Sequence, residues 1–313
     1  MEESKSIAGH GGILRKMPWA SLVEFAERLV SSIKRPVEFL RVVWRYASHT
    51  VRLAHHARTV RQTQGVRTLG VLPRLPLPVY TIWGIAETLG LTLVAREQKH
   101  TLLWLDLTEI KPHRLPAGDR KYINGRCVDI NKTTIARVFE EVCGRALSVD
   151  PRDYTGLMVE KSETNGVHDG RIVDGPLASP KKNQAYQRLI NNLSEDGKFV
   201  EDLRAVVAGT KLPVVYRKHR VHTRRFESSS VRSEIHQANE VFSATEQQQL
   251  IAFAERIGME FGELDVLRDR EDAQIYIVDA NKTSISPPIS MTYEKRFEAL
   301  TLTAKAFEQE FLT

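Results

Sequence analysis

The feature that most constrains the fold is a pair of short apolar segments near the C-terminal end, separated by a charged turn. Residues 263–267 read Glu-Leu-Asp-Val-Leu and residues 275–281 read Ile-Tyr-Ile-Val-Asp-Ala-Asn, while residues 268–272 between them are all charged. Two strand-forming segments on either side of a short polar turn are typical of a hairpin. We therefore predict an antiparallel hairpin over these residues.

This hairpin carries oxygen-bearing side chains. Residues two apart on a strand share a face, so Asp279 and Asn281 are expected to point the same way, with Asp265 on the neighbouring strand. Two carboxylates and an amide oxygen are hard donors that suit Mg²⁺ bound together with nucleotide phosphates. The alternative is that these acids cap turns or pair with arginines.

The rest of the chain after residue 131 alternates strand pairs with capped helices. Apolar spacing predicts a helix over residues 132–143 that ends at Gly144, and a capping box at Ser243 and Glu246 begins another. Strands are expected over residues 156–161, 171–173, 203–207 and 212–217, and a closing helix over residues 293–311. The class is therefore α+β, with antiparallel hairpins rather than a regular alternation of strands and helices.

A lysine stands at the end of the strand expected over residues 156–161. Lys161 is followed by a polar loop that contains Gly166 and Gly170, an arrangement that can bring an ammonium and backbone N–H groups onto phosphate oxygens. The loop lacks the Gly-Lys-Ser/Thr of a Walker A sequence. The alternative is an exposed hairpin loop, in which His168 is either an exposed turn residue or a substrate contact.

Arginines gather around the next strand pair. Arg204 lies within the first strand and Arg217 ends the second, with Arg220, Arg224 and Arg225 following. Guanidinium groups beside acids can clamp a transferring phosphoryl group or an acyl phosphate. The alternative is a solvated basic strand edge that discourages aggregation.

The order of these motifs resembles the ATP-grasp superfamily over roughly residues 130–290, and is most similar to its ribosomal-protein glutamate ligase branch, with D-alanine–D-alanine ligase more distant. The residues that carry the resemblance are, in order, Lys132, Lys161, Tyr186-Gln187-Arg188-Leu189-Ile190, Asp202-Leu203-Arg204, Arg217, Asp265 and Asp279-Ala280-Asn281. The resemblance implies an ATP-grasp fold, in which two α+β subdomains grip a nucleotide between them.

The resemblance also implies roles for these residues. ATP would be bound by Lys132, Lys161, the loop with Ser162, Gly166 and Gly170, and the adenine hinge Gln187, Arg188, Leu189 and Ile190. Asp265, Asp279 and Asn281 would hold one or two Mg²⁺ ions, with Mn²⁺ as a substitute, and Arg217, supported by Arg204, would stabilise the transferred phosphoryl group.

The implied activity is that of an ATP-dependent ligase, which converts a substrate carboxylate into an acyl phosphate for attack by an amine or a similar nucleophile. The alternatives are a phosphotransferase that acts on a hydroxyl, and a degenerate ATP-grasp protein that binds a membrane or a partner. The sequence identifies neither the carboxylate nor the nucleophile.

The chain departs from the family pattern at three places. Asp279 stands where the family usually has Glu, and residues 282–288 replace the Ser-Pro-Gly turn that commonly follows the Asn. No N-terminal α/β domain is evident in residues 1–75, and only residues 80–106 suggest a reduced version of one.

The basic character of the chain belongs to its N-terminal quarter. Residues 1–75 hold 13 Lys and Arg against 5 Asp and Glu, although the whole chain has a formal charge of only +6. This distribution argues against a specific nucleic-acid partner. The helical spacing of residues 15–60 indicates amphipathic helices that either pack on the protein body or contact an anionic membrane surface or an acidic partner.

These observations divide the chain into three parts. We predict a basic helical extension over residues 1–75, a reduced region over 76–130 and an ATP-grasp domain over 131–313, with a lid subdomain at about 145–186; prolines at 73, 76 and 78 mark the first boundary. Two cysteines without metal-ligand spacing and the lack of a signal-peptide pattern indicate a cytoplasmic protein, either free or peripheral at the inner membrane face.

Overall fold

The computed structural model describes residues 36–65, 67–95, 101–103, 122–164, 166–167, 169–227, 230–285 and 287–313. The chain divides into two compact units, Met1–Ala47 and Ser48–Thr313. In the first unit the structure describes only the start of helix α2 (Pro36–Gln64), which continues into the second. Residues 1–35 and 66 of the predicted basic extension, and His168, lie outside the described residues.

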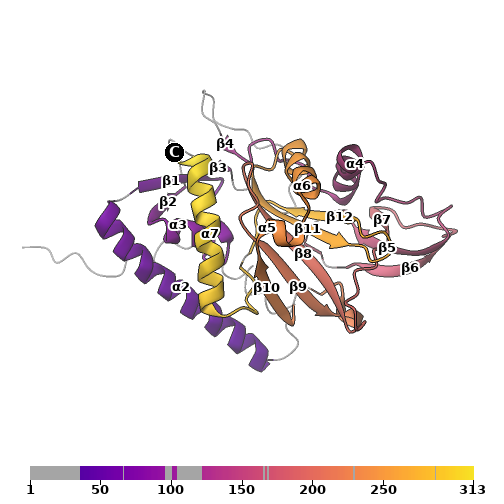
Figure 1. The fold of residues 1–313 in the computed structure, drawn as a ribbon, viewed down its shortest axis with the longest axis horizontal. Helices are drawn as coiled ribbons and strands as arrows, with labels where there is room; N and C mark the ends of the chain where they lie inside the picture. Colours follow the sequence, from indigo (N-terminus) through magenta and orange to yellow (C-terminus); the bar gives the residue numbers. More distant parts are fainter. Residues whose placement is uncertain are drawn as a thin grey trace, which may run out of the picture. The chain divides into compact units, whose positions relative to one another are not determined.

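The second unit contains three β-sheets, which Figure 1 shows with their helices. The α+β class predicted from the sequence is confirmed, as is the antiparallel pairing of the C-terminal hairpin. None of the helices in the described part of the chain combines the length and the apolar character needed to cross a membrane.

A small parallel sheet is formed by strands between residues 67 and 123. Its strands are β1 (Arg67–Leu72), β2 (Leu91–Val94), β3 (Thr101–Leu103) and β4 (Tyr122–Ile123), in the order β2-β1-β3-β4, and helix α3 (Thr81–Thr88) connects the first two. Leu69 and Val71 of β1 are fully buried against Phe307 of the C-terminal helix α7 (Tyr293–Phe311). Strand β1 lies within residues 1–75, where the sequence indicated only helices, because a strand buried on both faces lacks an alternating pattern.

The central sheet is antiparallel, in the order β10-β9-β8-β11-β12. Its strands are β8 (Phe199–Ala208), β9 (Val215–Val221), β10 (Arg232–His236), β11 (Phe261–Arg268) and β12 (Ile275–Asn281). The short helices η2 (His222–Arg224) and α5 (Ala238–Val241) lie in its connections.

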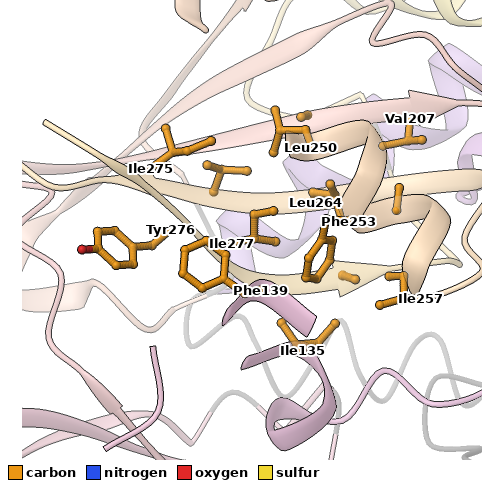
Figure 2. Close-up of a cluster of buried hydrophobic side chains, with 14 of the residues drawn as sticks. Ile135, Phe139, Val207, Leu250, Phe253, Ile257, Leu264, Ile275, Tyr276 and Ile277 are labelled. Carbon is orange, nitrogen blue, oxygen red and sulfur yellow. The ribbon is translucent and has the colours of Figure 1, made fainter. Parts of the chain in front are cut away.

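Two longer helices bury one face of the central sheet. Figure 2 shows Phe139 of α4 (Lys132–Cys143) and Leu250 and Phe253 of α6 (Ala244–Arg256) packed with Leu264 and Ile277 of the sheet. These five side chains are fully buried. The main core therefore occupies this face. On the other face, Val206 and Tyr216 pack with Ala299 of α7, and the polar side chains lie beside them.

The ends of these helices are fixed by local hydrogen bonds. The Asn131 side chain caps α4 by accepting from the Thr134 N–H at 2.7 Å, and Gly144 ends the helix with a φ of 68° that favours glycine. The predicted capping box of Ser243 and Glu246 is present at the start of α6. The bounds of α4 and α7 are those predicted from the apolar spacing.

The third sheet forms the region predicted as a lid. Its strands β5 (Gly156–Ser162), β6 (Arg171–Gly175) and β7 (Gln184–Arg188) are antiparallel in the order β6-β5-β7. Lys161 lies opposite Ala185 and Val159 lies opposite Gln187, so the side chains of Lys161 and Gln187 share one face of this sheet.

Candidate functional site

The two candidate metal-binding carboxylates lie directly opposite each other in the central sheet. Asp265 of β11 pairs with Asp279 of β12 on one side and with Arg204 of β8 on the other. Directly opposed residues on neighbouring strands share a face, so the three side chains lie together. Asn281 pairs with Glu263 one step along the same face. The hairpin register therefore brings the three predicted metal ligands together.

Asp265 is bound on both oxygens by a guanidinium. Arg204 donates from Nε to Oδ1 at 2.6 Å and from Nη2 to Oδ2 at 3.0 Å, and its Nη1 lies 3.4 Å from Oε2 of the buried Glu263. Burial raises the pKa of the Asp265 carboxyl, but Arg204 and Lys218 outweigh it and lower that pKa to about 2. Asp265 is therefore a carboxylate at neutral pH.

Asp279 is bound by Lys132, which lies 147 residues earlier in the chain. Lys132 is the first residue of α4, and its Nζ donates to Asp279 Oδ1 at 2.7 Å. The same oxygen accepts from the Ala280 N–H at 2.9 Å. The Lys132 side chain is 7% exposed, so this pair is shielded from water on the lysine side.

A second lysine, Lys161 from the lid sheet, also contacts β12. The pairing of β11 with β12 shifts by one residue between Asp265 and Val266, which leaves Val278 without a directly opposed residue. The carbonyl of Val278 accepts from Lys161 Nζ at 3.1 Å. Burial lowers the pKa of Lys161 to about 8, although the Asp279 carboxylate raises it. Lys132 and Lys161 thus converge on adjacent residues of β12.

Lys218 completes the polar face and was missed by the sequence analysis. Lys218 belongs to β9 and lies opposite Asp202 of β8. Asp202 is two residues from Arg204, so both side chains lie on the same face of β8. Lys218 is 5% exposed, and its ammonium makes no hydrogen bond or ion pair with any residue that the structure describes. Burial, together with the charge of Arg204, lowers its pKa to about 8, although Asp265 raises it. A largely buried lysine without a described hydrogen-bond or ion-pair partner is a candidate position for binding an anion.

The structure does not bring Arg217 to this face. Arg217 lies opposite Leu203 on one side and Glu234 on the other, and Leu203 belongs to the apolar core beneath the sheet. Alternation along β9 places Lys218, not Arg217, beside Arg204. The register of β9 therefore brings Lys218, and not Arg217, to the face that carries Arg204 and Asp265. Of the two predicted catalytic arginines, only Arg204 lies at the site.

The predicted phosphate loop is held to α4 at its start. Ser162 ends β5, and the next residue, Glu163, accepts from the Thr133 N–H at 3.0 Å and also binds the Thr133 hydroxyl. Gly166 has a φ of 76°. A Cβ on Gly170 would lie 2.6 Å from the Phe226 ring, so glycine permits the close contact there. The loop thus approaches the N-terminal end of α4, where Lys132 lies.

The predicted adenine hinge follows β7. Gln187 is buried on the same lid face as Lys161, and its Nε2 has no hydrogen-bond partner among the described residues. Arg188 donates to the Tyr276 hydroxyl at 2.9 Å and stacks over that ring at 4.9 Å. Leu189 is half-buried, and Ile190 is buried in the main core, which anchors the hinge.

The donor atoms of the site suit Mg²⁺. Asp265, Asp279 and Asn281 supply hard oxygens from adjacent positions of one hairpin. The Asn281 Oδ1 accepts from the Thr283 N–H at 3.0 Å, which orients the amide at the strand end. Among the described residues no cluster of three or more His, Cys, Asp or Glu side chains could hold a metal by itself. These ligands fit a cation that also takes oxygens from a bound phosphate.

The segment that follows β12 is anchored rather than free. Lys282 donates to the carbonyls of Cys127 and Val128 at 2.9 and 3.2 Å. Ser284 accepts from the Thr81 N–H at 3.0 Å and donates from its hydroxyl to Thr81 Oγ1 at 2.8 Å, which binds the segment to the start of α3. The small parallel sheet thus supports the loop in which the chain departs from the family pattern.

Comparisons with known proteins identify structural relatives only. No family model matches the sequence, and no curated protein matches it. Among solved structures, the ATP-grasp ligase PsnB complexed with a minimal precursor is similar at 13% identity and a TM-score of 0.38, covering 60% of this chain and 65% of that one. This chain thus spans less than two thirds of the length of that ligase.

Two other similar structures are covered almost completely. A RimK-domain ATP-grasp protein from Sphaerobacter thermophilus has 14% identity and a TM-score of 0.44, over 79% of this chain and 100% of that one. The D-alanine–D-alanine ligase of Bacillus anthracis, complexed with ATP, has 10% identity and a TM-score of 0.46, over 79% and 97%. The structures to which this chain is similar are thus ATP-grasp ligases, the superfamily that the sequence motifs indicated. Because these identities and TM-scores are low, the roles proposed for individual residues rest on the contacts within this chain alone.

Proposed function

We propose that the protein is an Mg-ATP-dependent ligase that activates a substrate carboxylate as an acyl phosphate. The observation that supports this proposal most is the convergence of lysines from two different elements on one strand. Lys132 from α4 and Lys161 from the lid sheet reach adjacent residues of β12, beside the opposed carboxylates of Asp265 and Asp279. Cations from two elements beside paired acids are what binding a metal-bound polyphosphate requires.

The balance of charge on this face favours an anionic ligand. Lys132, Lys161, Arg204 and Lys218 are gathered around three carboxylates, Asp265, Asp279 and Glu263. Of these cations, Lys218 is 5% exposed and makes no hydrogen bond or ion pair with a described residue. A bound triphosphate would give each ammonium a charge-assisted hydrogen bond.

The residues of this chain would divide the work as follows. Lys132 and Lys161 would bind and orient the phosphates, while Ser162, Gly166 and Gly170 form the loop that closes over them. The hinge from Gln187 to Ile190 would hold the adenine, and the buried Nε2 of Gln187 is available as a donor. Lys218 takes the role first assigned to Arg217: with Arg204, it would stabilise charge on the transferred phosphoryl group.

Asp265, Asp279 and Asn281 would hold the Mg²⁺, which neutralises the phosphate oxygens when it is bound. Phosphoryl transfer requires little covalent chemistry from the protein, so alignment and charge stabilisation by these side chains account for the catalysis. The substrate carboxylate would attack the γ-phosphorus, with ADP as the leaving group. The nucleophile would then attack the acyl carbon, with phosphate as the leaving group.

Release of ADP tests this proposal. The protein is incubated with Mg-ATP and sets of amino acids, sugar acids and peptides, and ADP is measured for the wild type and for Asp279→Ala. We expect a carboxylate-dependent ADP release that Asp279→Ala abolishes while the circular dichroism spectrum is unchanged. Glu298→Ala, which alters an exposed acid on α7, is the control and should keep full activity.

The products distinguish the alternatives. An amide or a similar conjugate together with phosphate supports the ligase, whereas a phosphorylated hydroxyl would identify a phosphotransferase. Full ADP release by Asp279→Ala would remove the metal-binding hairpin from the explanation. Failure of the wild-type protein to bind Mg-ATP in calorimetry would leave only a non-catalytic, degenerate ATP-grasp protein.

A further inference from the structure

Each candidate metal-binding carboxylate is already bound by a cation of the protein. Arg204 occupies both oxygens of Asp265 at 2.6 and 3.0 Å, and Lys132 occupies Oδ1 of Asp279 at 2.7 Å. Because Asp265 and Asp279 face each other directly, these cations offset the repulsion that two opposed carboxylates would otherwise have. The positive charges lie where a divalent cation would have to approach.

We infer that Arg204 and Lys132 are positioning residues that substitute for the divalent cation until nucleotide arrives. They hold Asp265 and Asp279 in place, and a bound triphosphate draws both cations off the carboxylates and so opens the site to the metal. This inference rests on the proposed function. It adds that the site binds a divalent cation poorly without nucleotide, and that metal and nucleotide bind with positive coupling.

The surroundings of Arg204 support such an exchange. Glu263, whose side chain is 1% exposed, lies 3.4 Å from Nη1 of Arg204, while Nε and Nη2 are the groups bound to Asp265. Arg204 can therefore release Asp265 and still keep a carboxylate neighbour, which avoids the cost of a buried, unpaired guanidinium. The ion pair with Glu263 would hold the guanidinium beside the phosphate position.

The surroundings of Lys132 are similar in kind. Its ammonium shares Asp279 Oδ1 with the Ala280 N–H, so the carboxylate keeps one hydrogen bond when the lysine leaves. Lys161 binds a backbone carbonyl and not a carboxylate, so it does not block a metal ligand. Among the described residues, Arg204 and Lys132 are thus the cations hydrogen-bonded to these two carboxylates.

The test measures Mn²⁺ binding by electron paramagnetic resonance without nucleotide, using Mn²⁺ alone as the probe. We expect the wild-type protein to bind Mn²⁺ weakly, and Arg204→Met and Lys132→Met each to bind it roughly tenfold more tightly, within the usual range of such couplings. Arg256→Met, which removes a cation paired with Glu141 on the surface, is the control for net charge and should leave the affinity unchanged.

A second arm uses the wild-type protein, so that the result does not depend on the folding of a variant. Addition of a non-hydrolysable ATP analogue should tighten Mn²⁺ binding by the protein beyond that of the analogue alone. Equal Mn²⁺ affinity with and without the analogue, or unchanged affinity in both variants, overturns the inference. Failure of the proposed function is recognised separately, because then the analogue itself does not bind in calorimetry.

Discussion

Lys218 and Arg217 are neighbours in the sequence but lie on opposite faces of the central sheet. Lys218 lies with Arg204 on the polar face, whereas Arg217 lies opposite the core residue Leu203. We expect Lys218→Met to lower kcat for ADP release by about 10²-fold, because it removes a cation that faces the transferred charge. Steady-state kinetics measure this effect.

The adjacent residue provides a matched control for that prediction. Arg217→Met removes the same charge one position away and should change kcat by less than about threefold, as expected for a group that does not touch the substrate. Equal losses in both variants would contradict the assignment of the polar face, and Lys218→Arg should restore part of the activity.

The buried lysines also predict a pH dependence of nucleotide binding. The pKa values of Lys161 and Lys218 are lowered to about 8, with burial as the largest cause. Each ammonium loses its proton as the pH rises through that value, so affinity for ATP should be constant below pH 7 and fall about tenfold by pH 9.5. Calorimetry over this range measures it.

Binding should also take up protons near pH 8, because a bound triphosphate raises the pKa of both lysines. The heat of binding would then depend on the ionisation enthalpy of the buffer. Lys161→Arg keeps its charge at all these pH values and should flatten the profile. A profile that rises above pH 8 would contradict the role of these ammonium groups.

At the scale of single elements, the lid sheet depends on one buried carboxylate. Glu160 of β5 accepts from Arg171 Nε at 2.7 Å, Lys181 Nζ at 3.2 Å and the Tyr186 hydroxyl at 3.0 Å, which ties β6 and β7 to β5. The hydrogen bond from Arg171 is the largest cause that lowers the pKa of Glu160 to about 2. The ionised Glu160 therefore stabilises the lid sheet at pH values above its ordinary pKa of 4.5. This stabilisation is lost as the pH falls from 4.5 toward 2.

We expect Glu160→Gln to accelerate amide hydrogen exchange in β5, β6 and β7 at neutral pH, with the central sheet unchanged. The wild-type lid should approach the behaviour of the variant as the pH is lowered below about 4. Glu195→Gln alters an exposed acid outside the sheet and is the control. Equal exchange in Glu160→Gln and the wild type would show that the network does not hold the lid.

Helix α6 is a second element whose packing contributes measurably to the free energy of unfolding. Leu250 is fully buried in the core that Figure 2 shows, beside Phe253 and Leu264. Leu250→Ala should lower the free energy of unfolding by about 2–5 kcal/mol, from lost burial and a residual cavity. Urea denaturation measures it; the exposed Leu302→Ala on α7 should cost far less.

Some elements could be predicted from the sequence because their signals are local. The cap and apolar spacing gave α4 and α7 their bounds, and a charged turn between apolar segments identified the β11–β12 hairpin. The register of β9 could not be predicted, because a one-residue shift exchanges the faces and no local signal determines the shift. The sequence therefore predicts Arg217 at the site, whereas the register places Lys218 there.

At the scale of the whole described molecule, the site consists of contacts between residues far apart in the chain. Lys132 and Asp279 are 147 residues apart, and Lys161 and Val278 are 117 apart. The order of the motifs predicted which residues belong together, but their contacts follow from how the lid, α4 and the central sheet pack. The sequence does not predict that Glu263 is buried beside Arg204, because an acidic residue near the end of a strand is usually exposed to solvent.

Strand β1 of the small parallel sheet was missed for a related reason, whereas α3, β2 and β3 lie within the residues 80–106 that suggested a reduced α/β region. Strand β1 pairs with β2 and β3 on its two sides and is buried on both faces, so it shows neither alternation nor a hairpin turn. It follows directly on α2, whose helical pattern dominates that part of the sequence. The predicted division at residue 75 stays a prediction.

Binding of a nucleotide is the central claim, and titration calorimetry with the magnesium complex of a non-hydrolysable ATP analogue tests it most directly. We predict saturable binding of one analogue per chain to the wild-type protein, and its loss in Lys161→Met with the fold retained. Absence of binding to the correctly folded wild-type protein, or undiminished affinity in Lys161→Met, would contradict the claim that this face holds a nucleotide.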